Sequence, residues 1–213
     1  MPHPSEAVDT IMKHWLVFAS LALAISAVVQ AAEGDASAGK TKSVTCAACH
    51  GADGNSVNPI WPKLAGQHPS YMAKQIMDFK KGERKDPTMT AMAAPLSDQD
   101  IADLAAYFSA EKHSVGTTDP QQVAVGERIY RGGNAAAGVA ACSACHGPAG
   151  TGNAAAQFPS LGGQHAAYVE KALKDFRAGA RVNDANGMMR GVAARLTDQE
   201  ILAVAQYIQG LHP

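Results

Sequence analysis

The pattern Cys-x-x-Cys-His occurs twice in this 213-residue chain, and the two copies use all four of its cysteines. Two cysteines three positions apart lie on one turn of helix, so both thiols can reach the two vinyl groups at one edge of a porphyrin. The histidine that follows them can then bind the iron from one side of the ring. The pattern therefore predicts two covalently attached haem c groups. The residues concerned are Cys46, Cys49 and His50 in the first copy, and Cys142, Cys145 and His146 in the second.

Two other uses of the cysteines stay open at this point, a zinc site and a pair of disulfides. A zinc site would draw its ligands from two distant parts of the chain and would have more candidate ligands than a tetrahedral ion can take. A disulfide within one Cys-x-x-Cys would close a very short loop and would be strained. A redox dithiol does not require histidine at the next position, yet histidine is present in both copies. The haem interpretation accounts for every cysteine and both histidines.

The N-terminal segment, residues 1–31, has the features of a secretory signal peptide. The basic Lys13 precedes an apolar run from Trp15 to Val29. Small residues surround the expected cleavage site, which follows Ala31 or Ala32. The polar residues before Met12 do not fit a signal peptide, which favours Met12 as the true start.

Export of the chain agrees with the cysteine motifs, because bacteria attach haem c outside the cytoplasm. The predicted location is the periplasm, where the protein would be soluble or loosely attached to the inner membrane. The competing interpretation is that the apolar run stays in place as a membrane anchor, but this run is short for a spanning helix.

The charges of the chain are nearly balanced, with 18 basic and 19 acidic side chains and a net charge of −1. No basic stripe indicates a nucleic-acid partner. The densest basic cluster is interpreted either as a solvated loop or as a docking site for an acidic redox partner. It consists of Lys80, Lys81, Arg84 and Lys85.

The two motif copies belong to a longer internal repeat. Pro62-Lys-Leu-Ala-Gly-Gln-His68 aligns with Pro159-Ser-Leu-Gly-Gly-Gln-His165, and Leu96-Ser-Asp-Gln-Asp aligns with Leu196-Thr-Asp-Gln-Glu. A linker rich in Ser, Gly, Thr and Pro separates the copies near residues 113–120. The repeat predicts a duplication of one unit into two domains, residues 32–114 and residues 115–213.

Each unit is predicted to be helical, because apolar residues recur at helical spacing and no stretch alternates for long enough to form a sheet. Ser97 and Thr197 have the form of helix N-caps with an acid three positions on, so the last helix of each unit is the clearest. A domain this small has a poor core of its own, and a buried haem would supply the missing apolar surface. Earlier helices are expected over residues 39–44, 70–80, 122–131 and 166–177.

Methionine is the expected second axial ligand, because His/Met ligation is a standard arrangement in electron-transfer haems and raises the reduction potential. Met89 and Met189 lie at equivalent positions, each eight residues before the N-cap of the last helix. Met92 and Met188 occur in one copy only, and the methionines of the second helix are typical core filler. The repeat therefore selects Met89 and Met189.

Histidine is the alternative second ligand. His68 and His165 also match between the copies, so bis-histidine ligation is possible. Both stand at the start of a helix, only a short loop beyond the haem motif. A role at the surface or facing the haem propionates is favoured for them.

Taken together, these residues resemble the di-haem cytochrome c4 family over nearly the whole chain after residue 31. The shared features are Cys-x-x-Cys-His-Gly, Pro-x-Leu-x-Gly-Gln, a methionine, and the Leu-(Ser/Thr)-Asp-Gln helix start. The resemblance implies an all-α fold, a tandem duplication of two cytochrome c-like domains with the haem propionates near their interface. It also implies axial ligation by His50 with Met89, and by His146 with Met189. The loop before Met89 is shorter than in some members, which leaves its shape open.

The sequence predicts an electron carrier without substrate chemistry, and therefore a protein that is not an enzyme. The resemblance implies electron transfer in the periplasm between respiratory-chain partners, often toward a terminal oxidase, and peripheral membrane association. The expected partners are a terminal oxidase and an upstream quinol-oxidising complex or small cytochrome. Two alternatives remain open: a cytochrome subunit of a dehydrogenase complex, and a di-haem peroxidase, against which the matched methionines argue.

Overall fold

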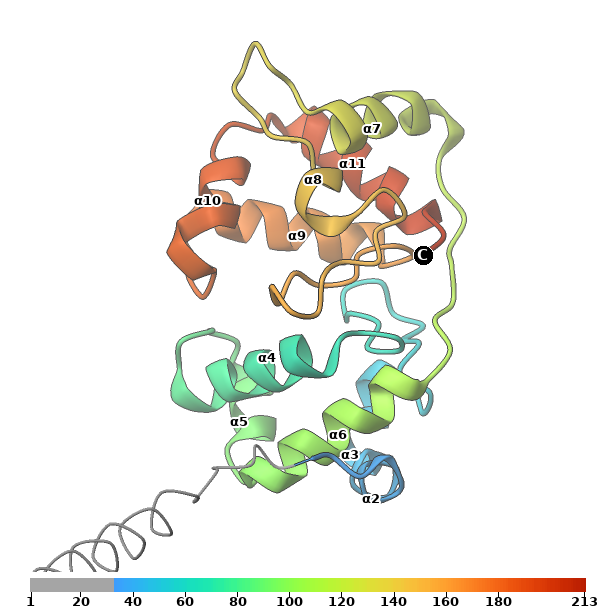
Figure 1. Cartoon of the computed structure of the whole chain (residues 1–213), viewed down its shortest axis with the longest axis vertical. Helices are drawn as coiled ribbons and strands as arrows, with labels where there is room; N and C mark the ends of the chain where they lie inside the picture. Colours follow the sequence, from blue (N-terminus) through green and yellow to red (C-terminus); the bar gives the residue numbers. More distant parts are fainter. Residues whose placement is uncertain (1–32) are drawn as a thin grey trace, which may run out of the picture. The chain divides into compact units, whose positions relative to one another are not determined.

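Helices joined by irregular loops build the part of the chain that the computed structural model describes, residues 33–213 (Figure 1). The β-type pairings within these residues are two isolated bridges, Asn134 with Val139 and Asn153 with Phe158. The predicted all-α fold is therefore confirmed. The predicted signal peptide, with its cleavage site and the possible start at Met12, lies outside the described residues.

The helices form two sets that follow one another in the same order, which confirms the predicted duplication. The first half of the protein consists of α2 (Ala36–Lys42), α3 (Val44–His50), α4 (Pro69–Lys81), α5 (Pro87–Ala93) and α6 (Asp98–Ala110). The second half consists of α7 (Pro120–Gly132), α8 (Ser143–His146), α9 (Ala166–Arg177), the 3-10 turn η1 (Ala185–Gly187), α10 (Met188–Ala193) and α11 (Asp198–Gly210). Figure 1 shows the two sets as separate groups, joined by an extended segment before α7.

The first helix of each half begins earlier than its periodicity predicts, because an aspartate caps it. The Asp35 carboxylate accepts hydrogen bonds from the backbone N–H groups of Ser37 and Ala38, so α2 begins at Ala36. Asp119 caps α7 in the same way through the N–H of Gln121. An N-cap aspartate satisfies backbone donors that the first helical turn leaves unpaired.

The last helix of each half starts where the sequence predicts. Ser97 and Thr197 each accept a hydrogen bond from the backbone of the acid at N3, and that acid accepts one from the cap in return. This reciprocal pair is a capping box. The apolar face that follows is buried, and it comprises Ile101, Leu104, Ala105 and Phe108 in α6, and Ile201, Val204, Ala205 and Ile208 in α11.

Two glycines let the first and last helices of each half cross in backbone contact. At Gly39 in α2, a Cβ atom would lie 2.0 Å from the carbonyl oxygen of Asp103 in α6. At Gly126 in α7, a Cβ atom would lie 2.1 Å from the carbonyl oxygen of Ala203 in α11. Only glycine fits at these crossings, so both halves use the same device to pack their terminal helices.

The α2–α6 crossing is also held by a buried carboxylate. Asp103 in α6 accepts hydrogen bonds from Lys42 Nζ at 2.6 Å, from the backbone N–H of Asp35 at 2.9 Å and from Gln99 Nε2 at 2.8 Å. These donors, with Lys42 the strongest, lower the pKa of Asp103 from 3.8 to about 2. The ionised carboxylate therefore stabilises the fold above its unfolded pKa, and this contribution is lost as the pH falls through about 2.

We expect Asp103→Asn to weaken this acid-sensitive contribution. The variant lacks the carboxylate whose pKa is lowered on folding, so its free energy of unfolding should fall less than that of the wild type between about pH 4 and pH 2. Denaturant unfolding followed by circular dichroism across this pH range measures the difference. Parallel pH profiles for the two proteins would mean that Asp103 does not contribute to acid sensitivity.

Candidate functional site

Each Cys-x-x-Cys-His motif forms a short helix that ends at its histidine. Cys46 and Cys49 lie within α3, whereas Cys142 is the N-cap of α8 and Cys145 lies within it. The glycine after each histidine ends the helix with a positive φ, 81° at Gly51 in the first half, which glycine adopts without strain. All four cysteines are free of disulfides.

The two motif histidines are buried and held by equivalent hydrogen bonds. His50 Nδ1 lies 2.9 Å from the carbonyl oxygen of Pro62, and His146 Nδ1 lies 3.0 Å from that of Pro159. A carbonyl oxygen can only accept, so Nδ1 carries the proton and Nε2 is left with a free lone pair. Burial lowers the pKa of both histidines, against the opposing effect of the carbonyl. Each ring is therefore neutral and oriented to bind a metal through Nε2.

One cavity of about 870 Å³ brings the predicted site residues together. It is lined by both motifs and by both selected methionines, in full Cys46, Cys49, His50, Met89, Cys142, Cys145, His146 and Met189. The rest of its wall is largely apolar and includes Phe79, Leu104 and Phe108 from the first half, and Phe176, Val204 and Ile208 from the second. Paired thiols, a neutral imidazole and a thioether in an apolar enclosure are a donor set that fits haem c.

Each selected methionine lies on a short helix, between α4 and α6 in the first half and between α9 and α11 in the second. Met89 is in α5 and Met189 is in α10, and both are partly buried at the cavity wall. The neighbouring Met92 and Met188 also line this cavity, but they keep 40% and 43% of their surface exposed, whereas Met89 and Met189 are partly buried. The N-caps of these short helices differ between the halves. In the first half, the Asp86 carboxylate caps α5 by accepting a hydrogen bond from the backbone N–H of Met89.

In the second half the N-cap of α10 is Gly187, which makes no side-chain cap bond. Asp184 accepts from both the N–H and Nε of Arg190, at 3.0 and 2.8 Å. Between them lies η1, in which Asn186 has a φ of 54°. The two loops thus position equivalent methionines by different routes.

The alternative histidine ligands do not line this cavity. His165 Nε2 instead lies 2.8 Å from the backbone oxygen of Ser56 in the first half. His68 Nε2 is buried without a hydrogen-bond partner among the described residues. The structure therefore gives no support to bis-histidine ligation by this pair, and it places His165 at a contact between the halves.

Two repeated glutamines join the halves by reciprocal hydrogen bonds, a role that sequence reasoning missed. The Gln67 side chain donates to the carbonyl of Ser160 and accepts from its N–H, both at 2.9 Å. The Gln164 side chain makes the same two bonds to the backbone of Lys63, also at 2.9 Å. Ser160 and Lys63 occupy equivalent positions in the repeat, as Gln67 and Gln164 do. The contact therefore has local two-fold symmetry. The repeated Pro-x-Leu-x-Gly-Gln segment was the available signal for it.

A second reciprocal contact uses arginine and tyrosine. Arg84 donates to the hydroxyl of Tyr168, and Arg181 donates to the hydroxyl of Tyr71, each at 3.0 Å. All four side chains line the large cavity. Arg84 therefore faces inward and does not belong to an exposed basic cluster with its neighbours Lys80, Lys81 and Lys85.

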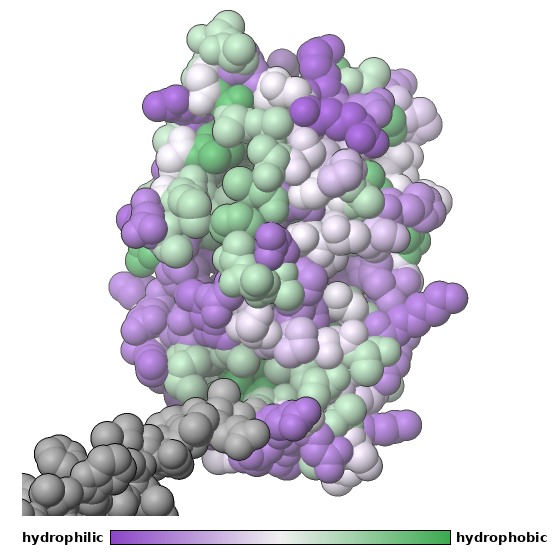
Figure 2. Space-filling model, viewed as in Figure 1, coloured by the Kyte–Doolittle hydropathy of each residue, from purple (hydrophilic) through white to green (hydrophobic). Residues whose placement is uncertain are grey.

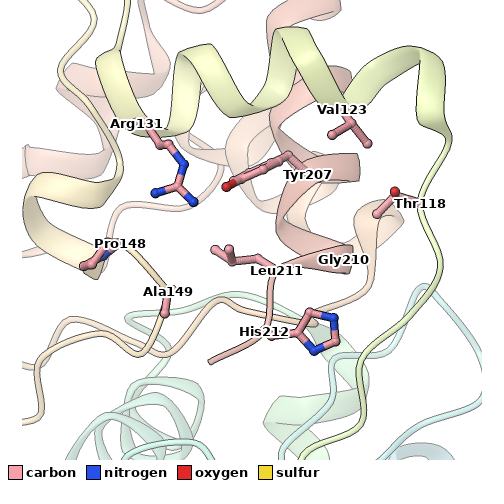
Figure 3. Close-up of a pocket in the computed structure, with 9 residues that line it drawn as sticks. All are labelled: Thr118, Val123, Arg131, Pro148, Ala149, Tyr207, Gly210, Leu211 and His212. Carbon is pink, nitrogen blue, oxygen red and sulfur yellow. The ribbon is translucent and has the colours of Figure 1, made fainter.

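A smaller cavity of about 320 Å³ lies between α7, the end of α11 and the loop after α8 (Figure 3). Arg131, Tyr207 and His212 are among its lining residues, but no predicted site residue is. Arg131 is engaged by Glu127, whose carboxylate lies 2.9 Å from its Nε. Figure 2 shows hydrophobic and hydrophilic residues mixed over the face in view, with hydrophobic residues gathered over the second half.

Comparison with known proteins identifies relatives in both halves. The cytochrome c family model matches residues 31–110 and again residues 130–212. Cytochrome c4 from Thiocapsa roseopersicina is 56% identical over 180 residues, which cover 84% of this chain and 93% of that protein. The crystal structure of reduced recombinant cytochrome c4 from Pseudomonas stutzeri is similar with a TM-score of 0.82 and 53% identity, covering 84% of this chain and all of that one.

A further relative carries a different name. The thiosulfate dehydrogenase electron acceptor of Stutzerimonas stutzeri is 36% identical over 203 residues, which cover 91% of this chain and 93% of that protein. Among residues 33–213, no helix has the length and hydrophobicity needed to span a membrane.

Proposed function

Because this chain belongs to the cytochrome c4 family of di-haem electron-transfer proteins, we propose that it carries electrons between respiratory-chain partners in the periplasm, toward a terminal oxidase. Covalently attached haem c supplies iron that alternates between the ferric and ferrous states. The protein supplies the ligands, the enclosure and the docking surfaces. The single observation that carries the proposal is the common cavity, which gathers two complete sets of thiols, imidazole and thioether.

The proposed roles of the site residues follow from their chemistry. The thiols of each motif form the thioether links, so that the cofactor cannot dissociate. Each motif histidine and the methionine of the same half would hold the iron. In full, Cys46, Cys49, His50 and Met89 serve the first haem, and Cys142, Cys145, His146 and Met189 serve the second.

The surroundings of these residues suit electron transfer. The hydrogen bond from His50 Nδ1 to the carbonyl of Pro62, and the equivalent bond from His146 to Pro159, hold each imidazole in one orientation. The apolar wall excludes water from the site. Fixed ligands and a dry enclosure reduce the rearrangement that each electron transfer requires. A thioether ligand also favours the ferrous state and so raises the reduction potential.

The domain boundaries and the location are part of the same proposal. We assign residues 1–31 to a cleaved signal peptide, residues 32–114 to the first cytochrome domain and residues 115–213 to the second. The helix-free segment between α6 and α7 supports the internal boundary. N-terminal sequencing of protein recovered from the periplasmic fraction tests the cleavage site.

A second candidate function is favoured by one relative. The name of the thiosulfate dehydrogenase electron acceptor indicates that a similar chain receives electrons from a dehydrogenase. The same fold and cofactors would serve that role, because both functions need reversible one-electron chemistry at two haems. The two candidates differ in the partner that reduces the protein.

Stopped-flow mixing with purified partners separates these candidates. The reduced holoprotein is mixed with the terminal oxidase of the same organism, and the oxidised holoprotein with its quinol-oxidising complex or with a thiosulfate dehydrogenase and thiosulfate. We expect rapid oxidation by the oxidase and rapid reduction by the quinol-oxidising complex. Rapid reduction by the dehydrogenase, without exchange with the oxidase, would contradict the first candidate and support the second.

A further inference from the structure

The arginines Arg84 and Arg181 occupy equivalent positions in the two halves and reach across to each other's half. The backbone N–H of Arg84 donates to the carbonyl of Asp78, and that of Arg181 donates to the carbonyl of Asp175, both at 3.0 Å. Their guanidinium groups then donate to a tyrosine hydroxyl of the opposite half. Each guanidinium also lies over a phenylalanine ring of its own half, at 4.6 and 4.4 Å from the ring centroid. Both are thus held rigidly at the contact between the halves.

The positive charges of this arginine pair have only neutral partners in the described chain. Arg84 bonds Gln75 Oε1 at 2.8 Å, and Arg181 bonds the same oxygen at 3.0 Å. Arg181 also donates to Asn183 Oδ1, and it is only 8% exposed. No carboxylate within residues 33–213 forms an ion pair with either arginine, although eight other ion pairs are present in that range.

A buried cation without an anion is costly, so the pair requires a compensating negative charge. Asp78, a buried acid that bonds the same Asn183 as Arg181 does, is itself engaged by Lys74 and does not pair with either arginine. Arginine recognises carboxylates with its planar set of donors better than any other side chain does. The charge therefore has to come from a group that enters the cavity and carries carboxylates.

Both arginines line the cavity that holds the two Cys-x-x-Cys-His motifs. Haem c carries two propionate carboxylates and is otherwise apolar, which matches a largely apolar cavity that contains the arginine pair. We propose that Arg84 and Arg181 form one shared receptor for propionates of both haems, so that each arginine influences both reduction potentials. This inference rests on the haem sites proposed above.

The sharing follows from the crossed contacts. Because Arg84 is bonded to Tyr168 and Arg181 to Tyr71, neither charge belongs to one half alone. Gln75 accepts from both arginines, but its aligned position in the second half is Ala172, so the pair has a single central acceptor. A charge held between the two sites acts on both irons through the low-dielectric interior.

The test replaces each arginine with glutamine in the full-length holoprotein and measures both potentials by spectroelectrochemistry. Without its arginine, a propionate charge is uncompensated and favours the ferric state. We expect Arg84→Gln and Arg181→Gln each to shift the oxidised-to-reduced ratio of both haems about tenfold toward oxidised, which is 59 mV for one electron. Arg128→Gln is the matched control, because it removes an equal charge from an exposed site on α7.

The pH dependence distinguishes carboxylate binding from a merely structural role. A propionate that has lost its arginine gains protons more easily, and protonation removes its negative charge. The potentials of the glutamine variants should therefore be higher near pH 5 than near pH 8, and the wild-type profile should be flatter. Arg84→Lys and Arg181→Lys retain the charge and should restore the flatter profile. The titratable groups that contact the pair or its partners are Tyr71, Tyr168, Lys74 and Asp78.

Haem content and the ferric spectrum are recorded on the same samples. If the wild type itself lacks two haems per chain, the proposed sites fail independently of the arginines. If both haems are present but the potentials of the glutamine variants match those of Arg128→Gln, the receptor is overturned. A shift confined to the haem of the substituted half would overturn the sharing. If Arg181→Gln fails to fold, Arg84→Gln still tests the receptor, because Arg84 is less buried than Arg181. Tyr71→Phe, which removes only the crossed contact of Arg181, provides a second test.

Discussion

Replacing Met189 with histidine is expected to lower the reduction potential of one haem by about 0.1 V or more, within the roughly 0.8 V range that axial ligands span. Imidazole donates more strongly than a thioether and stabilises ferric iron, so the exchange favours the oxidised state. The other haem should keep its potential nearly unchanged. Spectroelectrochemical titration of the purified holoprotein measures both values. Met89→His should have the same effect on the other haem.

The chain provides a matched control for each exchange. Met188 is next to Met189 on α10, and Met92 lies about one turn from Met89 on α5. Both control methionines are substantially exposed. Met188→His and Met92→His introduce the same chemical change without replacing a proposed ligand. Their potentials should stay at the wild-type values. A large shift in Met188→His without one in Met189→His would reassign the ligand of the second haem.

Gly126→Ala should cost the second half about 3 kcal/mol or more of its free energy of unfolding, the upper part of the usual range for overpacking. The new methyl group would lie 2.1 Å from the backbone oxygen of Ala203 and 2.6 Å from Tyr207 Cβ. Backbone cannot rotate away as a side chain can, so α7 and α11 must separate. Denaturant unfolding followed by the helical circular dichroism signal measures the loss.

Gly132→Ala on the same helix is the control. A Cβ atom at Gly132 would meet nothing within 4 Å. The substitution should therefore leave stability unchanged or raise it by up to about 1 kcal/mol, because alanine favours a helix more than glycine does. Equal stability of the two variants would mean that the helix crossing tolerates a side chain, against the packing described above.

Local patterns predicted the parts of the protein that depend on neighbours in sequence. The capping boxes at Ser97 and Thr197 are formed, because an N-cap and its acid interact within one helical turn. The duplication allowed the methionines to be compared, and it selected two that line the cavity together with the cysteine motifs. The assignment of Met89 and Met189 as axial ligands stays a prediction.

Contacts between distant residues could not be predicted in the same way. Gln67 and Gln164 were visible as a repeated pair, but one sequence does not reveal that each amide bonds the backbone of the opposite half. In the sequence, Arg84 was grouped with an exposed basic cluster, because the other three members of that cluster are lysines. Its inward orientation depends on Tyr168, which lies 84 positions away in the chain.

The most direct test of the proposed His/Met sites is the absorption spectrum of the ferric protein, recorded with a pyridine haemochrome determination of its haem content. We expect two haem c groups per chain and the weak far-red band that methionine sulfur gives ferric haem, with an intensity that corresponds to both irons. In Met89→His and in Met189→His, half of that band should disappear. Two haems per chain without the band would contradict methionine ligation and would indicate bis-histidine or open iron sites instead.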